Sequence, residues 1–369
     1  MDVPSRLAGT LLATALLACP VMVRANPATE IETALSLPDS ITNGVTVSRD
    51  GRLFLVLARI DGSAGPRVVE MHNGRQLPYP DADWNRWTID ADPRGAFVRV
   101  NSLRIGPEGN LWLVDVGAPG LDQTVLPGGA KLVRIDLATN AVSRIYDLEQ
   151  AIEPKSFLDD VRFNGRHAYL TDAGVPGLIV LDLQTGATRR VLDGHNSVSA
   201  DRPISAEGRI VRGVNGAPIV IHADQLEVSP DGQTLYFQAC TGPLYRVPTR
   251  LLDDPAVSST DLEAGVSVVA DTPPTGGTAI AADGTIYLSD TDTQRILTIA
   301  PDGTTRTLVQ DPRLLWVDAM WLDGSGKLWM PAAQINRLAP FQGGRSRVQF
   351  PMTVFSVQIN SKPPANDHP

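Results

Sequence analysis

A short motif that recurs six times along the chain constrains the fold more than any other feature of the sequence. Each copy has a polar residue, an alternating apolar run, a turn that ends in glycine, and a second apolar run. Such a unit is typical of two short β-strands joined by a tight turn. The turn glycines lie 42 to 67 residues apart, at Gly51, Gly109, Gly165, Gly232, Gly284 and Gly326. A repeat of about fifty residues with only strands and turns predicts a β-propeller.

We therefore predict an all-β, six-bladed β-propeller with four-stranded blades over residues 30–359. Outer hairpins follow the inner ones, for instance where residues 131–137 and 141–146 flank a turn. Residues 30–37 alternate between polar and apolar ahead of the first copy, and residues 353–359 alternate near the end. Pairing these two segments would close the ring and leave no free strand edge. The polar residues 360–369 are predicted to be a disordered tail.

The first 25 residues have the pattern of a signal peptide. Arg6 precedes an apolar run from Leu7 to Val23, and small residues mark a cleavage site before Asn26. The run is short for a membrane span, so we expect export to the periplasm or the extracellular space. An alternative is a lipoprotein in which Cys19 is acylated. In a chain cut before Asn26, Cys240 is the one thiol and no internal disulfide can form.

The charge of the chain excludes one class of partner. The formal net charge is −9, and no basic stripe is present that could neutralise phosphates. Nucleic acid is therefore not an expected partner. We expect a monomer whose partner is a small molecule.

Six aligned polar residues are the strongest candidates for a binding site. Each stands two residues before the first apolar position of a predicted inner strand: Asn43, Asn101, Asp159, Asp224, Thr278 and Asp318. Oxygen-rich side chains at a channel mouth suit a hard cation such as Ca²⁺, with Asn101, Asp224 and Asp318 as candidate ligands. They suit an ammonium ligand equally well. Alternatively, each residue could cap its own turn.

Two connections are long enough to cover that mouth. Residues 77–100 carry Trp84 and Trp87, and residues 193–223 are polar and contain glycine. Long loops in compact domains are often functional, and we expect both to overhang one mouth of the channel, with the two tryptophans as ligand contacts. His222 precedes Asp224 by two residues, so both are candidates for a catalytic base, although His222 could equally be a solvated loop residue.

The ordered set of segments resembles the yellow/major royal jelly protein family. The resemblance is carried by residues 77–80, 104–117, 131–137, 168–180 and 235–252, in the order of the family. It implies a secreted six-bladed propeller. Some members bind biogenic amines in the central channel, and insect members are linked to dopachrome conversion. Kinship of fold does not by itself transfer an activity.

A more distant resemblance is to calcium-dependent propellers of the gluconolactonase type. The metal ligands of that group correspond to Asn43, Asn101, Asp224 and Asp318. The acidic ligand of its first blade is replaced by Asn43, and Asp224 stands where asparagine is usual. Both departures weaken the case for a metal.

Three hypotheses about function remain open. The first is a propeller that binds a small amine or aromatic ligand at the channel mouth, with dopachrome-type tautomerase activity as its chemistry. The second is a Ca²⁺-dependent lactone hydrolase. The third is a secreted interaction module without enzymatic activity.

Overall fold

The structure is a computed structural model that describes Met1, residues 30–60 and residues 62–366. The predicted signal peptide and the alternative acylation at Cys19 lie outside the described residues. No helix in the described part of the chain is long and apolar enough to cross a membrane.

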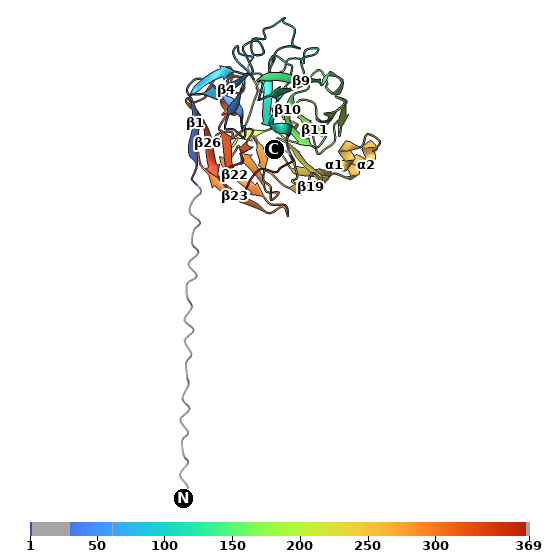
Figure 1. The fold of residues 1–369 in the computed structure, drawn as a ribbon. Helices are drawn as coiled ribbons and strands as arrows, with labels where there is room; N and C mark the ends of the chain where they lie inside the picture. Colours follow the sequence, from blue (N-terminus) through green and yellow to red (C-terminus); the bar gives the residue numbers. More distant parts are fainter. Residues whose placement is uncertain (2–29, 61, 367–369) are drawn as a thin grey trace.

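Six four-stranded antiparallel sheets surround a central axis, which confirms the predicted six-bladed propeller (Figure 1). Each sheet is one blade, numbered here in chain order from the innermost strand outward. Blade 1 consists of β2 Thr42–Val47, β3 Leu53–Leu57, β4 Val68–His72 and β5 Arg75–Pro78. Blade 2 consists of β6 Val100–Ile105, β7 Leu111–Asp115, β8 Lys131–Asp136 and β9 Ala141–Asp147. Blade 3 consists of β10 Leu158–Asn164, β11 His167–Asp172, β12 Gly177–Asp182 and β13 Thr188–Val191.

Blades 4 to 6 complete the ring. Blade 4 consists of β16 Ala223–Val228, β17 Thr234–Ala239, β18 Leu244–Pro248 and β19 Ser267–Ala270. Blade 5 consists of β20 Thr278–Ile280, β21 Ile286–Asp290, β22 Arg295–Ile299 and β23 Thr305–Gln310. Blade 6 consists of β24 Trp321–Leu322, β25 Lys327–Pro331, β26 Met352–Gln358 and β1 Glu32–Leu37.

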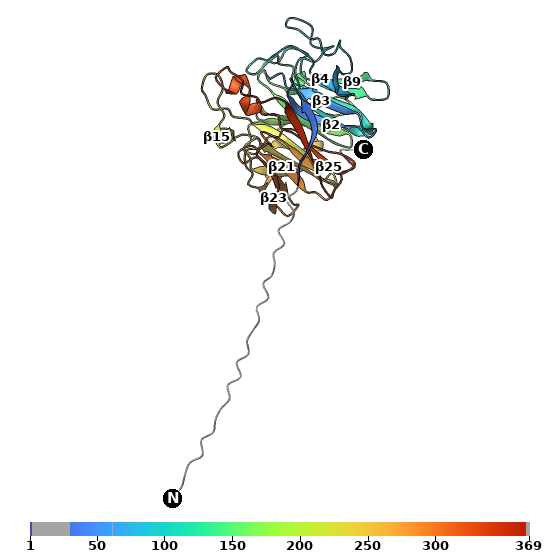
Figure 2. The same cartoon turned by 90° about the vertical axis from the view of Figure 1, so that its left-hand side faces the viewer.

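The predicted closure of the ring is confirmed. Strand β1 pairs antiparallel with β26, from Glu32 opposite Ser356 to Leu37 opposite Met352. The N-terminal segment is thus the outermost strand of blade 6, and it covers an edge that would otherwise be open (Figure 2).

The six turn glycines explain why the inner hairpins are so regular. All six have positive φ, between 57° and 86°, a region that side chains with a Cβ disfavour. Side chains between neighbouring blades then form the core. Trp112 of blade 2, for example, packs against Phe163 of blade 3 with ring centroids 4.8 Å apart.

Several short elements lie in the connections. Helices α1 Thr249–Asp253 and α2 Ser259–Ala264 join β18 to β19, and the small hairpin of β14 Ser205–Ala206 and β15 Arg209–Ile210 lies in the long connection before blade 4. Four 3₁₀ turns occupy the other links: η1 Pro107–Gly109, η2 Glu149–Ala151, η3 Ile335–Arg337 and η4 Ala339–Phe341.

Residues 360–366 of the predicted tail belong to the described structure, and residues 367–369 lie outside it. Residues 360–366 lie against the propeller, where the Ala282 N–H donates to the Lys362 carbonyl at 2.7 Å and Asn366 Nδ2 donates to the Ser229 carbonyl at 2.9 Å. Both partners lie in inner-hairpin turns, at the end of the channel opposite the aligned polar residues. Backbone groups left open in those turns give the polar tail its partners.

Candidate functional site

The aligned polar residues meet around the channel axis because the innermost strands run side by side in one direction. Gly44 of blade 1 forms a parallel bridge with Ala319 of blade 6, and every innermost strand begins at the same end of the channel. The side chains of Asn43, Asn101, Asp159, Asp224 and Asp318 consequently line one cavity of about 360 Å³. We call these five residues the polar ring.

Thr278, the sixth aligned residue, lies deeper. Its hydroxyl donates to the Glu227 carboxylate at 2.8 Å, and it lines a void of about 10 Å³ beneath the ring. That volume corresponds to roughly one water molecule.

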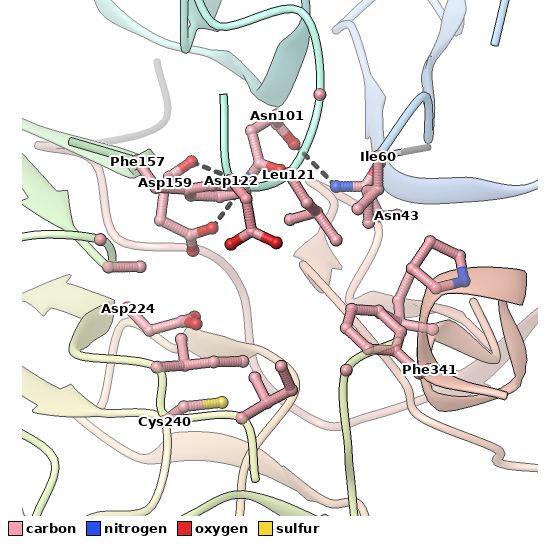
Figure 3. A pocket seen from close by; sticks show the side chains of 18 of the residues that line it. Asn43, Ile60, Asn101, Leu121, Asp122, Phe157, Asp159, Asp224, Cys240 and Phe341 are labelled. Carbon is pink, nitrogen blue, oxygen red and sulfur yellow. Dashed lines mark hydrogen bonds between the residues drawn. The ribbon is translucent and has the colours of Figure 1, made fainter. Parts of the chain in front are cut away.

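Hydrogen bonds tie the amide side of the ring together (Figure 3). Asn43 Nδ2 donates to the Asn101 carbonyl at 2.9 Å, and Asn101 Nδ2 donates to Asp159 Oδ1 at 2.5 Å. Asn43 Oδ1 is buried and has no partner within the described residues. One acceptor of the ring is therefore left for something other than this chain.

The carboxyl groups of Asp159 and Asp224 lie close enough that each changes the pKa of the other. Burial raises the pKa of Asp159 to about 7. Burial, and next the charge of Asp159, raise the pKa of Asp224 well above its usual range. Two carboxyl groups in contact cannot both ionise cheaply, so this pair holds a proton near neutral pH.

Asp318 completes the acidic part of the ring. It accepts hydrogen bonds from the Ala319 N–H at 2.9 Å and from Trp316 Nε1 at 3.2 Å. Burial, followed by the charge of Asp159, raises the pKa of Asp318 well above its usual range.

A layer of paired charges fills the channel below the ring. Arg162, 1% exposed, contacts Asp160 at 2.6 Å and Glu227 at 2.7 Å. Burial alone would raise the pKa of Asp160, but the charges of Arg162 and Arg104 outweigh it and lower that pKa. Asp159 and Asp160 are thus adjacent carboxylates in opposite electrostatic environments.

The walls of the cavity come from loops between strands. Leu121 and Asp122 belong to the β7–β8 connection, Phe157 precedes β10, Ile221 ends the 193–223 connection, and Phe341 lies in η4. Figure 3 shows these loops around the ring. The 193–223 connection therefore covers the mouth as expected.

The 77–100 connection places its tryptophans elsewhere. Trp84 packs on Phe97 with ring centroids 4.9 Å apart, and Trp87, 6% exposed, lies in a separate small core. Neither lines the cavity. Asn85 Oδ1 accepts the backbone N–H groups of Arg67 and Val68, which fastens this loop to the side of blade 1.

His222 also lies outside the cavity lining. Its Nδ1 accepts the Ala200 N–H at 3.2 Å, and burial lowers its pKa. The alternation that aligns His222 with Asp224 holds only within a continuous strand. Because β16 begins at Ala223, His222 still follows the path of the preceding loop.

Arg99 and Phe157 are cavity residues that the sequence analysis missed. Both residues immediately precede an inner strand, Arg99 before β6 and Phe157 before β10, and this nearness to the aligned polar residues was the one available signal.

The oxygen atoms of the ring have the right chemistry for Ca²⁺, but their arrangement does not match a metal centre. Within the described residues, no group of three or more His, Cys, Asp or Glu side chains is gathered closely enough to hold a metal ion.

Comparison with known proteins gives one family and one fold. The model of the family described as "Major royal jelly protein" matches residues 98–362. No curated protein matches the sequence.

Three solved structures illustrate the likeness in fold. A calcium-binding regucalcin from Agrobacterium tumefaciens is 15% identical, with a TM-score of 0.54 over 90% of this chain and 95% of that one. A gluconolactonase from Xanthomonas campestris is 13% identical, with a TM-score of 0.52 over 90% and 98%. The virginiamycin B lyase of Staphylococcus aureus, in its inactive H270A form with quinupristin, is 13% identical, with a TM-score of 0.52 over 89% and 100%. At these identities the likeness shows the fold alone.

Proposed function

The chain belongs to the major royal jelly protein family, and from that premise we propose that it binds a small organic cation, an amine with an aromatic or apolar body, in the cavity above the polar ring. We propose further that it acts after export, consistent with the pattern of residues 1–25.

One observation carries this proposal: three carboxyl groups, that of Asp224 buried and those of Asp159 and Asp318 partly buried, converge on one cavity. Asp159, Asp224 and Asp318 all have raised pKa values because burial and mutual repulsion disfavour their ionised forms. An ammonium group placed among them would favour ionisation and form charge-assisted hydrogen bonds. It would also supply the positive charge that the ring lacks.

The walls favour an organic ligand over a bare ion. Phe157, Leu121, Ile221 and Phe341 enclose the volume above the ring. A cavity of about 360 Å³ is within the range that accommodates a single small molecule. No group of three or more His, Cys, Asp or Glu side chains among the described residues could hold a metal ion, so the lactonase hypothesis has less support.

The Asp159–Asp224 pair can supply proton transfer as well as charge. One carboxylate can take a proton from a carbon of a bound ring while the neighbouring carboxylic acid gives one to an oxygen of the same ring. This is the proton balance of a tautomerisation, with no net oxidation. We assign the acid role to Asp224, whose pKa is raised by the contact with Asp159, and the base role to Asp159, whose pKa the same contact lowers. We assign His222 no part because it lies outside the cavity lining.

Calorimetric titration with dopamine and with serotonin tests the proposal. We expect binding to the wild-type protein and a loss of about tenfold or more in affinity for Asp224→Asn and Asp318→Asn, since each removes a charge-assisted contact. Asp302→Asn, an exposed turn residue of an outer hairpin, is the matched control and leaves affinity unchanged.

Three other results would redirect the assignment. No heat with any amine would refute the binding proposal. Calcium-dependent hydrolysis of a lactone would favour the hydrolase. A double Asp224→Ala, Asp318→Ala variant with unchanged ligand binding and thermal stability would favour an interaction module. The decay of dopachrome absorbance, followed with wild type and Asp224→Asn, tests the proton-transfer step separately.

A further inference from the structure

Arg99 is a buried cation at the wall of the cavity. Its side chain is 3% exposed, and it lines the same cavity as the polar ring. It immediately precedes β6, at the end of the channel where the polar ring lies. The cavity therefore has both acidic and basic groups in its lining.

The charge of Arg99 is not balanced by a dedicated partner. Its Nε and Nη1 are buried without a hydrogen-bond partner in the described structure, and its guanidinium lies 4.6 Å from the centroid of the Phe157 ring. Asp115 is the carboxylate whose charge favours the ionised form of Arg99, and it is already paired with the buried Lys131 at 2.8 Å. Asp115 also accepts the N–H groups of Val98 and Arg99.

Leaving a guanidinium in this state is costly. Burial lowers the pKa of Arg99 to about 10, so the group still carries its charge at neutral pH. A buried charge without a counterion normally destabilises the folded protein. An uncharged apolar side chain at the same place would cost less free energy. An anionic group delivered by a ligand would supply the missing counterion, because a guanidinium binds a carboxylate through two parallel N–H bonds, either Nε with Nη2 or Nη1 with Nη2.

We propose that Arg99 binds a carboxylate of the ligand, so that the ligand is a zwitterion: an α-amino acid with an aromatic or apolar side chain rather than a simple amine. This inference rests on the proposed function, because it takes the ammonium as bound by the polar ring. The two charged groups of an α-amino acid sit on one carbon, so one ligand can face both the polar ring and Arg99, which line the same cavity. The side chain is then left for the wall of Leu121, Ile221 and Phe341.

Charge balance favours a carboxylate over a phosphate. One guanidinium matches a single negative charge, whereas a phosphate dianion would face Asp159, Asp224 and Asp318 across the cavity with a surplus. The second cation of the lining, Lys155, already donates to the Asp122 carbonyl.

Calorimetric comparison of tryptophan with tryptamine, and of tyrosine with tyramine, tests the inference, because each pair differs only in the carboxylate. Wild-type protein should bind the amino acid about tenfold or more tightly than the amine. In Arg99→Met this preference should vanish while the affinity for the amine is kept. Arg99→Lys should retain part of the preference. Arg306→Met, which removes an exposed arginine from β23, should behave as wild type.

The outcomes separate this inference from the proposed function. If the amines bind as tightly as the amino acids and Arg99→Met leaves the ratio unchanged, the carboxylate contact is refuted and amine binding stands. If neither member of either pair binds, the proposed function fails and this inference fails with it. The wild-type ratio decides the question even if a variant does not fold.

Discussion

Replacing Asp159 by asparagine should stabilise the protein above about pH 4, by an amount that grows as pH rises to about 7. The pKa of this carboxyl rises from its ordinary value of 3.8 to about 7 on folding. The folded state therefore binds more protons than the unfolded state between those values. The stabilising contribution of the protonated group is complete below pH 4 and is lost as pH rises through 7.

The magnitude follows from that shift. At about 1.4 kcal/mol per pH unit, ionising Asp159 in the folded protein costs about 4 kcal/mol. Because Asp159 borders the cavity and is only half-buried, water reduces this cost, and we expect about 2 to 4 kcal/mol. Asparagine has no charge, and its amide can still accept from Asn101 and donate to Asp224. The free energy of unfolding should therefore match wild type at pH 4 and exceed it by that amount at pH 8.

The neighbouring residue provides a control with the opposite sign. The pKa of Asp160 is lowered by Arg162 and Arg104 against the effect of burial, so its contribution is present above its unfolded pKa and is lost as pH falls through the folded one. Asp160→Asn should destabilise at pH 8. Urea unfolding of wild type and both variants at pH 4 to 8, after dialysis to remove ligands, measures all three curves. Parallel curves for wild type and Asp159→Asn would refute the reasoning.

Other parts of the structure make further predictions. Arg162→Met should destabilise by about 3 to 5 kcal/mol in urea unfolding, because Asp160 and Glu227 would be left buried without their cation; an effect below 1 kcal/mol would contradict a tight ion-paired layer. Deleting Glu32–Leu37 should expose the edge of β26, lower the melting temperature and cause association visible in light scattering, and a monodisperse, equally stable product would argue against ring closure by β1. The Cys240 thiol, 1% exposed and with its pKa raised by burial, should react with a thiol reagent only after denaturation, so rapid labelling of the native protein would show that the cavity floor opens.

Local signals in the sequence were sufficient for the ring but not for its surroundings. The turn glycines and the period-two alternation are properties of a few consecutive residues, and they located every inner strand and thereby Asn43, Asn101, Asp159, Asp224 and Asp318. The pairing of residues 30–37 with the last blade could be predicted because an open strand edge is normally covered in β-proteins.

What could not be predicted depends on contacts between distant residues. The docking of Trp84 and Trp87 on the side of blade 1 is decided by the Asn85 side chain, which meets backbone groups of Arg67 and Val68. The isolation of Arg99 is decided by the pairing of Asp115 with Lys131. The raised pKa values of Asp159 and Asp224 arise from burial and from the closeness of other carboxyl groups. Both depend on the folded structure and cannot be predicted from a single position in the sequence.

The pairing of β1 with β26 also determines the order in which the molecule can be completed. During synthesis the first strand of the domain emerges long before its partner, since Glu32 meets Ser356 across nearly the whole described chain. Until then blade 6 has three strands, and residues 30–37 must wait without a partner. Contacts of such separation slow folding, because the entropy of closing the loop is lost before the pairing repays it. Ring closure is thus the last step, and the polar ring, whose members come from five blades, can gain its final geometry only when that step is complete.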